Sequence, residues 1–354
     1  MAIVTINKVG ISSIGAIVPK NIESNQDYSL FNQEDKEKFI KTVGIEERRF
    51  VSSSQTTTAD LSILLVLQAL EKANWNKNEV GALIFVSQMR DFIIPCTATI
   101  LQHKLGLPVS CLAFDIPLGC SGYVYGLYVL SSLIGSKGVK KGILIAGDVC
   151  SPSLSYEDKS TYPLFGDASS CTLLEYDPKA SSMQFNLESD GKGYESIIMR
   201  DGGCRHPFTD SSLIAEQYAE GVKHNNIQIH LDGYSIFEFS VTQVVDNIRA
   251  LLKSTNNEID DFDSYVLHQA NLLIIKSIAK ILKADKSKVR LSLLKYGNTS
   301  STSIPLTIVD AYENKEMLGK EKILICGFGV GLSYASAIIE TNGKNCLPLL
   351  EYEE

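Results

Sequence analysis

Hydrophobic residues along the chain fall into two alternating patterns. Short apolar runs of strand length occur at 82–87, 110–114, 142–146, 265–267 and 322–326. Nearly continuous apolar runs of this kind are typical of strands that are covered on both faces. Longer segments with helical periodicity lie between them, at 58–73, 121–135, 241–254, 271–282 and 304–314. This alternation of buried strands with helices predicts a layered α/β fold.

The chain also contains a weak internal sequence repeat. The run ILIAG at 143–147 resembles ILICG at 323–327, and each run is followed by a second segment that reads as a strand. A five-residue match can arise by chance, so duplication stays open on this ground alone. If this repeat reflects a duplication, the chain consists of two halves that join near residue 180 and form a cleft between them.

The stretch 181–226 is polar and rich in Gly, Ser and Asp. It predicts long loops, either as a functional lid or tunnel wall or as a plain surface excursion.

Composition narrows the class of protein. The chain has 354 residues, of which 44% are hydrophobic and 21% charged, as in ordinary globular proteins. Its net charge of −8 argues against nucleic acid as a partner. The eight cysteines contain no CxxC pair, so a disulfide or zinc framework is not expected. No signal peptide and no membrane span are apparent, and we expect a cytoplasmic protein without a metal.

Cys120 is the first candidate for chemistry. It follows a predicted strand and a glycine, and a helix is predicted from about residue 121. The free amides and the dipole of a helix N-terminus favour thiolate over thiol, which would suit a nucleophile. The alternative is a buried structural cysteine, which is the commoner role.

Three later segments add polar groups at the ends of predicted strands or in turns. His268 directly follows the strand at 265–267, at the edge where α/β folds bind ligands. Asn298 lies in the turn YGNTSS, and the glycine-rich turn GFGVG at 327–331 could direct amides at an oxyanion. Each of these segments taken alone is equally compatible with a structural role.

Taken in order, the motifs GCSG, HQAN, GNTSS and GFGVGLS resemble those of the thiolase-fold condensing enzymes. The similarity is to the β-ketoacyl-acyl-carrier-protein synthase III type and runs from about residue 11 to residue 340. It implies a duplicated α-β-α-β-α fold. Residues 1–177 would form a half that carries the nucleophilic cysteine, and residues 178–354 a half that carries the histidine and the asparagine.

The resemblance also implies roles for individual residues. Cys120 would take an acyl group from a thioester. His268 and Asn298 would hold the carbonyl of the malonyl thioester and assist its decarboxylation. Phe328 would lie beside the malonyl carboxylate, and the turn through Gly329 and Val330 would support the oxyanion. The family acts as a homodimer in lipid and fatty acid biosynthesis and needs no cofactor besides its acyl-coenzyme A, acyl-carrier and malonyl-carrier substrates.

A basic segment follows the His268 motif. Lys276, Lys280 and Lys283 are spaced four and three residues apart, so they share one face of a helix. Acyl carrier proteins are acidic, which makes this face a candidate docking site. A solvated helix face is the alternative.

Other positions depart from the family pattern. Lys38, Thr42 and Lys159 stand where housekeeping members carry an aromatic residue and arginines that hold coenzyme A. Lysine and threonine do not reproduce the forked geometry or the stacking of arginine. The acyl donor could therefore be a carrier protein. Ile94 replaces an aromatic residue that reaches the acyl pocket of the neighbouring subunit, so a specialised acyl preference is expected.

Three rival functions remain. An acyltransferase could move the Cys120-bound group to an oxygen or nitrogen nucleophile, but it would have little use for Asn298. A catalytically silent subunit would be expected to lose the cysteine. A thiolase would need a second catalytic cysteine, and Cys326 precedes the glycine turn and reads as strand core.

Overall fold

The computed structural model describes residues 2–135 and 138–353, and two sheets organise them. The six-stranded sheet has the order β17 (Leu350–Tyr352), β2 (Val9–Pro19), β8 (Ala168–Tyr176), β7 (Lys141–Asp148), β5 (Ala82–Val86) and β6 (Leu112–Ile116). The five-stranded sheet has the order β1 (Ala2–Ile6), β9 (Met183–Ser189), β16 (Ser333–Asn342), β15 (Lys320–Gly329) and β14 (Ser264–Leu267).

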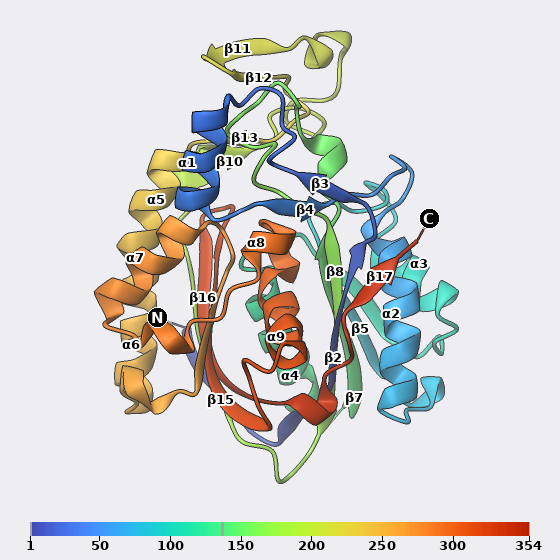
Figure 1. The fold of residues 1–354 in the computed structure, drawn as a ribbon. Coiled ribbons are helices and arrows are strands. Elements are labelled where there is room, and N and C mark those ends of the chain that lie inside the picture. The colour runs from blue at the N-terminus through green and yellow to red at the C-terminus, as the bar shows by residue number, and fades with distance from the viewer. Residues whose placement is uncertain (1, 136–137, 354) are drawn as a thin grey trace.

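Helices form three layers around these sheets (Figure 1). The central layer, α4 (Gly122–Gly135) and α9 (Ser303–Glu313), packs between the two sheets and contacts both. The six-stranded sheet is covered outside by α2 (Thr58–Lys72) and α3 (Thr97–Lys104), and the five-stranded sheet by α6 (Gln243–Thr255) with α5 (Gly233–Val241) and α7 (Leu272–Leu282). The predicted α-β-α-β-α fold is confirmed.

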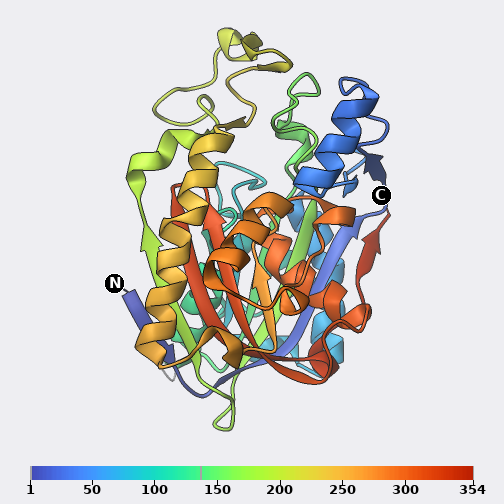
Figure 2. The ribbon, with the colours of Figure 1, turned by 60° about the vertical axis from the view of Figure 1, so that its left-hand side comes forward.

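Shorter elements gather at the upper end of the layers (Figure 2). They include the helices α1 (Gln33–Val43) and α8 (Leu293–Tyr296) and three small strand pairs: β3 (Ile22–Ser24) with β4 (Glu47–Arg49), β10 (Ile197–Ile198) with β13 (His230–Leu231), and β11 (Glu216–Ala219) with β12 (Val222–His224). The 3₁₀ segments are Lys77–Glu79, Ser151–Ser153, Gly191–Ser196, Asp210–Leu213, Ile259–Asp261, Lys286–Lys288, Ser300–Thr302 and Gly343–Asn345.

The interpretation of 181–226 as loops is wrong at its start. β9 is a central strand of the five-stranded sheet, between β1 and β16. Met183, Phe185 and Leu187 alternate with polar residues and point into the core. The polar residues between them made the segment resemble a loop in its composition. The alternation of apolar and polar residues is nevertheless the pattern of a strand.

The two similar runs, 143–147 and 323–327, lie in strands that occupy equivalent positions in the two sheets. β7 pairs parallel with β5 and antiparallel with β8, and β15 pairs parallel with β14 and antiparallel with β16. The terminal strands are exchanged, because β1 joins the sheet of the second half and β17 joins the sheet of the first. A division of the chain at residues 177 and 178 remains our prediction.

Neither a membrane-spanning helix nor a cluster of metal-binding side chains is found among the described residues. Within 2–135 and 138–353, no helix is long and apolar enough to cross a bilayer. The same residues contain no group of three or more His, Cys, Asp or Glu side chains placed to hold a metal ion.

Glycines let α4 approach the sheet closely. A Cβ atom at Gly126 would lie 2.6 Å from Leu144 Cδ1 and 2.8 Å from Val86 Cγ2. Since Leu144 and Val86 belong to β7 and β5, the missing side chain allows the helix to settle onto both strands. The start of α4 and the residues just before it are thereby held at the carboxyl ends of these strands.

We predict that Gly126→Val destabilises the protein by about 1–3 kcal/mol, because the added methyl groups overpack this contact. Gly233→Ala is the matched control, since a Cβ atom there would meet no atom within 4 Å. Urea unfolding followed by circular dichroism measures both variants. An unchanged midpoint for Gly126→Val would contradict the proposed close packing.

Candidate active site

Cys120 lies in the tight turn between β6 and α4. Opposite this turn, β15 contributes Gly327 and Gly329. A Cβ atom at Gly329 would lie 2.8 Å from Cys120 Cβ and 2.9 Å from its Sγ, and one at Gly327 would lie 2.8 Å from the Cys120 carbonyl oxygen. β15 can therefore approach the Cys120 turn only because these positions lack side chains.

His268 and Asn298 are positioned by backbone hydrogen bonds to other segments. The His268 N–H donates to the carbonyl oxygen of Cys326 on β15 at 2.8 Å, which continues the pairing of β14. The Asn298 N–H donates to the carbonyl oxygen of Leu164 at 2.8 Å, and the Asn298 carbonyl accepts from the Gly166 N–H at 3.1 Å. Asn298 is thus anchored to a loop of the first half.

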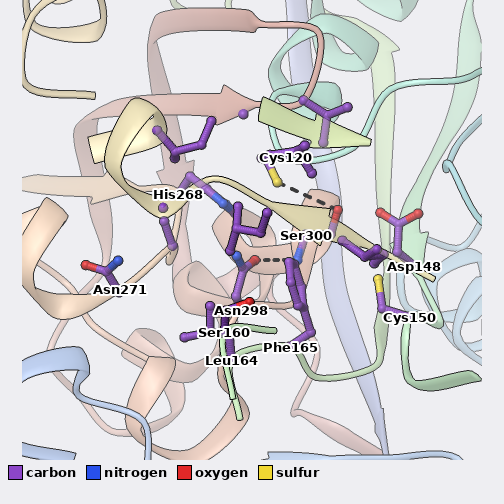
Figure 3. Close-up of a pocket in the computed structure, with 18 of the residues that line it drawn as sticks. Cys120, Asp148, Cys150, Ser160, Leu164, Phe165, His268, Asn271, Asn298 and Ser300 are labelled. Carbon is purple, nitrogen blue, oxygen red and sulfur yellow. Dashed lines mark hydrogen bonds between the residues drawn. The ribbon is translucent and has the colours of Figure 1, made fainter. Parts of the chain in front are cut away.

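These three side chains line one pocket of about 690 Å³. Figure 3 shows Cys120, His268 and Asn298 around the same space, although they are far apart in the sequence. Phe328, Gly329 and Val330 complete this end of the pocket. The rest of the wall is mainly apolar, with residues such as Met89, Phe165, Ile197, Ile229 and Ile236.

Burial controls the charge of the cysteine. Desolvation, and secondarily the carboxylate of Asp148, raises the pKa of Cys120 to about 12, while a hydrogen bond from Ser300 and the amides of Cys120 and Val330 act in the opposite direction. The expectation that the helix N-terminus produces a resting thiolate is therefore not met. The cost of burying a charge outweighs the attraction of the amides.

Burial acts on His268 as well. Desolvation lowers the pKa of the imidazole to about 3. Its Nδ1 lies 2.7 Å from Ser303 Oγ, and its ring meets the Phe328 ring edge to face at a centroid distance of 5.3 Å. At neutral pH the pocket consequently holds a neutral thiol beside a neutral imidazole.

Ser300 connects two of the candidate residues. Its Oγ lies 3.9 Å from Cys120 Sγ, and its backbone N–H donates to Asn298 Oδ1 at 3.0 Å. Because Oδ1 accepts this bond, the amide nitrogen of Asn298 stays available as a donor. The sequence analysis placed Ser300 in a motif without giving it a function.

Asp148 is the main feature that the sequence analysis missed. This fully buried carboxylate accepts hydrogen bonds from Ser87 Oγ at 2.9 Å, from the Gln88 N–H at 2.8 Å and from Ser301 Oγ at 2.9 Å. It ties the ends of β5 and β7 to the Asn298 turn, and burial raises its pKa. The available signal was an acidic residue placed directly after the apolar run of β7.

The residues predicted for the coenzyme A region also come together. Lys38, Thr42 and Lys159 line a smaller hollow of about 340 Å³ with Phe31 and Asp35, and Lys159 borders the main pocket as well.

The remaining candidates lie outside the main pocket. Lys276 and Lys280 are exposed on α7, and Lys283 is exposed at its C-terminal end. Ile94 is 84% exposed, in a loop with Phe92 and Ile93, and does not line the pocket of its own chain.

Comparisons with known proteins agree with this geometry. Residues 114–191 match the family model described as 3-oxoacyl-[acyl-carrier-protein (ACP)] synthase III, and residues 252–341 match its C-terminal counterpart. The β-ketoacyl-[acyl-carrier-protein] synthase III of Streptococcus mutans is 31% identical over 93% of this chain and 98% of its own length. The enzyme of the same name from Campylobacter curvus is 32% identical over 96% and 98%.

A solved structure extends the similarity to the fold. The 3-oxoacyl-(acyl-carrier protein) synthase of Burkholderia xenovorans superimposes with a TM-score of 0.91, at 32% identity and with 99% of each chain covered. The chain therefore belongs to the 3-oxoacyl-[acyl-carrier-protein] synthase III family and is a condensing enzyme of the thiolase fold.

Proposed function

We propose that Cys120 accepts an acyl group from a thioester and that the enzyme then condenses this group with malonyl-acyl-carrier protein to give a β-ketoacyl-acyl-carrier protein and carbon dioxide. The observation that carries the proposal is the convergence of Cys120, His268 and Asn298 in one buried pocket. No metal or redox cofactor is needed for either step, because the substrates supply all reacting atoms.

In the loading step the sulfur of Cys120 attacks the thioester carbonyl. The thiol proton goes to the departing thiolate, so the charge of the pocket does not change overall. The amides of Cys120 and Val330, which are directed at the sulfur, would support the oxyanion that forms beside it. A covalent thioester divides one difficult condensation into two easier reactions.

In the condensation step the malonyl thioester loses carbon dioxide and becomes an enolate. We propose that the Ser303 hydroxyl, whose Oγ lies 2.7 Å from His268 Nδ1, donates to this nitrogen and so leaves the imidazole proton on Nε2. The Asn298 amide nitrogen would be the second donor, because Oδ1 accepts from the Ser300 N–H. Two neutral donors can thus hold the enolate oxygen while its carbon attacks the acyl group on Cys120. The C–S bond to Cys120 then breaks, the β-ketoacyl product leaves on the carrier protein, and the sulfur takes up a proton from solvent to return to the thiol. The apolar wall around them limits competition from water.

The pKa of His268 argues against the rival acyl transfer to oxygen or nitrogen. Burial lowers the pKa of His268, which weakens this imidazole as the general base that transfer to a hydroxyl group would use. A silent subunit is not favoured either, because the nucleophile and both donors remain in place.

The proposed partners follow from the surface. Lys276, Lys280 and Lys283 form a basic face that would receive the acidic carrier protein. A second copy of the chain would pack along β6, which is an edge strand of the six-stranded sheet, next to the exposed loop Phe92–Ile94. There Ile94 would reach the neighbouring acyl pocket.

We predict that Cys120→Ala abolishes the acyl adduct detected by intact mass after incubation with acyl-coenzyme A and acyl-carrier thioesters. Cys150→Ala is the matched control, because this buried thiol lines the same pocket. The Cys150→Ala variant should still be acylated, because it keeps Cys120. An adduct that persists in Cys120→Ala would overturn the assignment of the nucleophile.

We predict that His268→Ala and Asn298→Ala still load the acyl group but release carbon dioxide from malonyl-acyl-carrier protein about 10²–10³ times more slowly, as expected when an oxyanion donor is removed. Adduct formation and radiolabelled carbon dioxide are measured on the same preparations. Normal carbon dioxide release from either variant would refute the role of that residue.

We predict that the double change Lys276→Glu and Lys280→Glu raises the KM for the carrier-protein substrate about tenfold and leaves the KM for a short thioester mimic unchanged, because only the former touches the basic face. Lys253→Glu, at an exposed position on α6, is the control for a lysine-to-glutamate change outside this face. Equal effects on both substrates would exclude docking at this face.

A further inference from the structure

The side-chain amide of Gln88 lies in the active-site pocket, next to the turn that carries the nucleophile. Gln88 is the second residue after β5, and it lines the same pocket as Cys120. A Cβ atom at Gly119 would overlap Gln88 Oε1 and lie 3.0 Å from Gln88 Cδ. The amide therefore occupies the space that is left by a glycine directly before Cys120.

A buried carboxylate fixes the backbone from which this side chain projects. Asp148 Oδ1 accepts hydrogen bonds from the Gln88 N–H at 2.8 Å and from the Met89 N–H at 3.3 Å. Ser87 Oγ donates to the same oxygen at 2.9 Å and accepts from the Met89 N–H at 3.0 Å. Gln88 therefore starts from a well-defined position, which suits a group that recognises a ligand.

The amide itself has no protein partner. Within residues 2–135 and 138–353, neither its oxygen nor its nitrogen forms a hydrogen bond, and the residue remains accessible. Met89, Cys150 and Phe165 make other parts of the pocket wall apolar or weakly polar. A plain alkyl chain packed against Gln88 would displace water from the amide and give no hydrogen bond in return, which is unfavourable.

Ser300 places a hydroxyl group near this amide. Its Oγ would lie 3.2 Å from the same Cβ position at Gly119, and it lies 3.9 Å from Cys120 Sγ (Figure 3). Two polar groups thus flank Gly119 where an acyl chain on Cys120 would begin. The third carbon of such a chain is three bonds from the sulfur, so an oxygen on that carbon would be within reach of these groups.

We propose that Gln88 selects an acyl group that carries a hydroxyl or carbonyl oxygen on its third carbon. The inference rests on the proposed function, in which Cys120 takes an acyl group from a thioester. The amide nitrogen of Gln88 donates to either kind of oxygen, and the amide oxygen accepts from a hydroxyl group only. Condensation adds two carbons from the malonyl group, so the selected oxygen lies on the fifth carbon of the product.

The test compares acyl groups with the same carbon skeleton. Butyryl-, 3-hydroxybutyryl- and acetoacetyl-pantetheine carry neither phosphate nor carrier protein, so docking does not enter the comparison. The rate of Cys120 acylation is followed by intact mass. Wild type should load one enantiomer of the 3-hydroxybutyryl group faster than the other, because the two have equal intrinsic reactivity and Gln88 approaches from one side. If the natural group is a 3-oxo compound, acetoacetyl loading instead shows the dependence on Gln88.

The variant Gln88→Met keeps an unbranched side chain of similar length and removes both hydrogen-bonding atoms. It should slow the loading of the preferred oxygenated group about tenfold, as expected when one hydrogen bond is lost, and should not slow the loading of butyryl. Gln26→Met makes the same change at an exposed position outside the pocket and should leave every rate unchanged. Circular dichroism verifies that both variants are folded.

The proposal fails if Gln88→Met slows butyryl and both oxygenated groups equally, or slows none of them, and Cys120 would then remain the nucleophile. Calorimetry on Cys120→Ala, with and without Gln88→Met, measures binding of the same thioesters without acylation. Absence of any adduct in wild type, together with a preference in binding that depends on Gln88, would refute the proposed function and support the oxygen-binding site. Absence of both would refute both ideas.

Discussion

The catalytic arrangement depends on the contact between the Cys120 turn and the glycines of β15. A side chain at Gly327 would meet backbone atoms of Cys120 and Ser121 at 2.8 and 2.9 Å, which cannot move aside like the tip of a flexible side chain. The hydroxyl groups of Ser121 and Ser333, 2.6 Å apart, fasten the same junction. Cys120 follows a strand of the six-stranded sheet and His268 follows a strand of the five-stranded sheet, so their relative geometry is only as well defined as this contact.

The contact also keeps water away from the side chains of Cys120 and His268. The pKa values of both groups shift so that their neutral forms are favoured. Desolvation raises the pKa of Cys120 and lowers that of His268, so the resting site avoids a buried ion pair. Asp148, a carboxylate that lines the pocket, is surrounded by hydroxyl and amide donors. A neutral pair of donors suits a reaction in which the negative charge arises on the substrate.

Much of this could be predicted from local sequence. Apolar runs located β5, β7, β14 and β15, and ordered glycine and polar motifs located Cys120, His268 and Asn298. Asp148, Ser300 and Ser303 were missed because their contacts join segments up to 180 residues apart, and no local pattern reports such a partner. The protonation state of Cys120 was mispredicted for a related reason. The sequence shows that Cys120 precedes a helix, whereas the depth at which its thiol is buried depends on the packing of distant segments.

The exchange of terminal strands has a consequence for how the protein is made. β17 completes the edge of the six-stranded sheet beside β2, although more than three hundred residues separate the two strands. During synthesis β2 therefore leaves the ribosome with this edge unpaired until residues 350–352 emerge. An unpaired edge is a site for intermolecular pairing. Chaperone dependence during folding should accordingly reflect this one late pairing more than the overall stability of the fold.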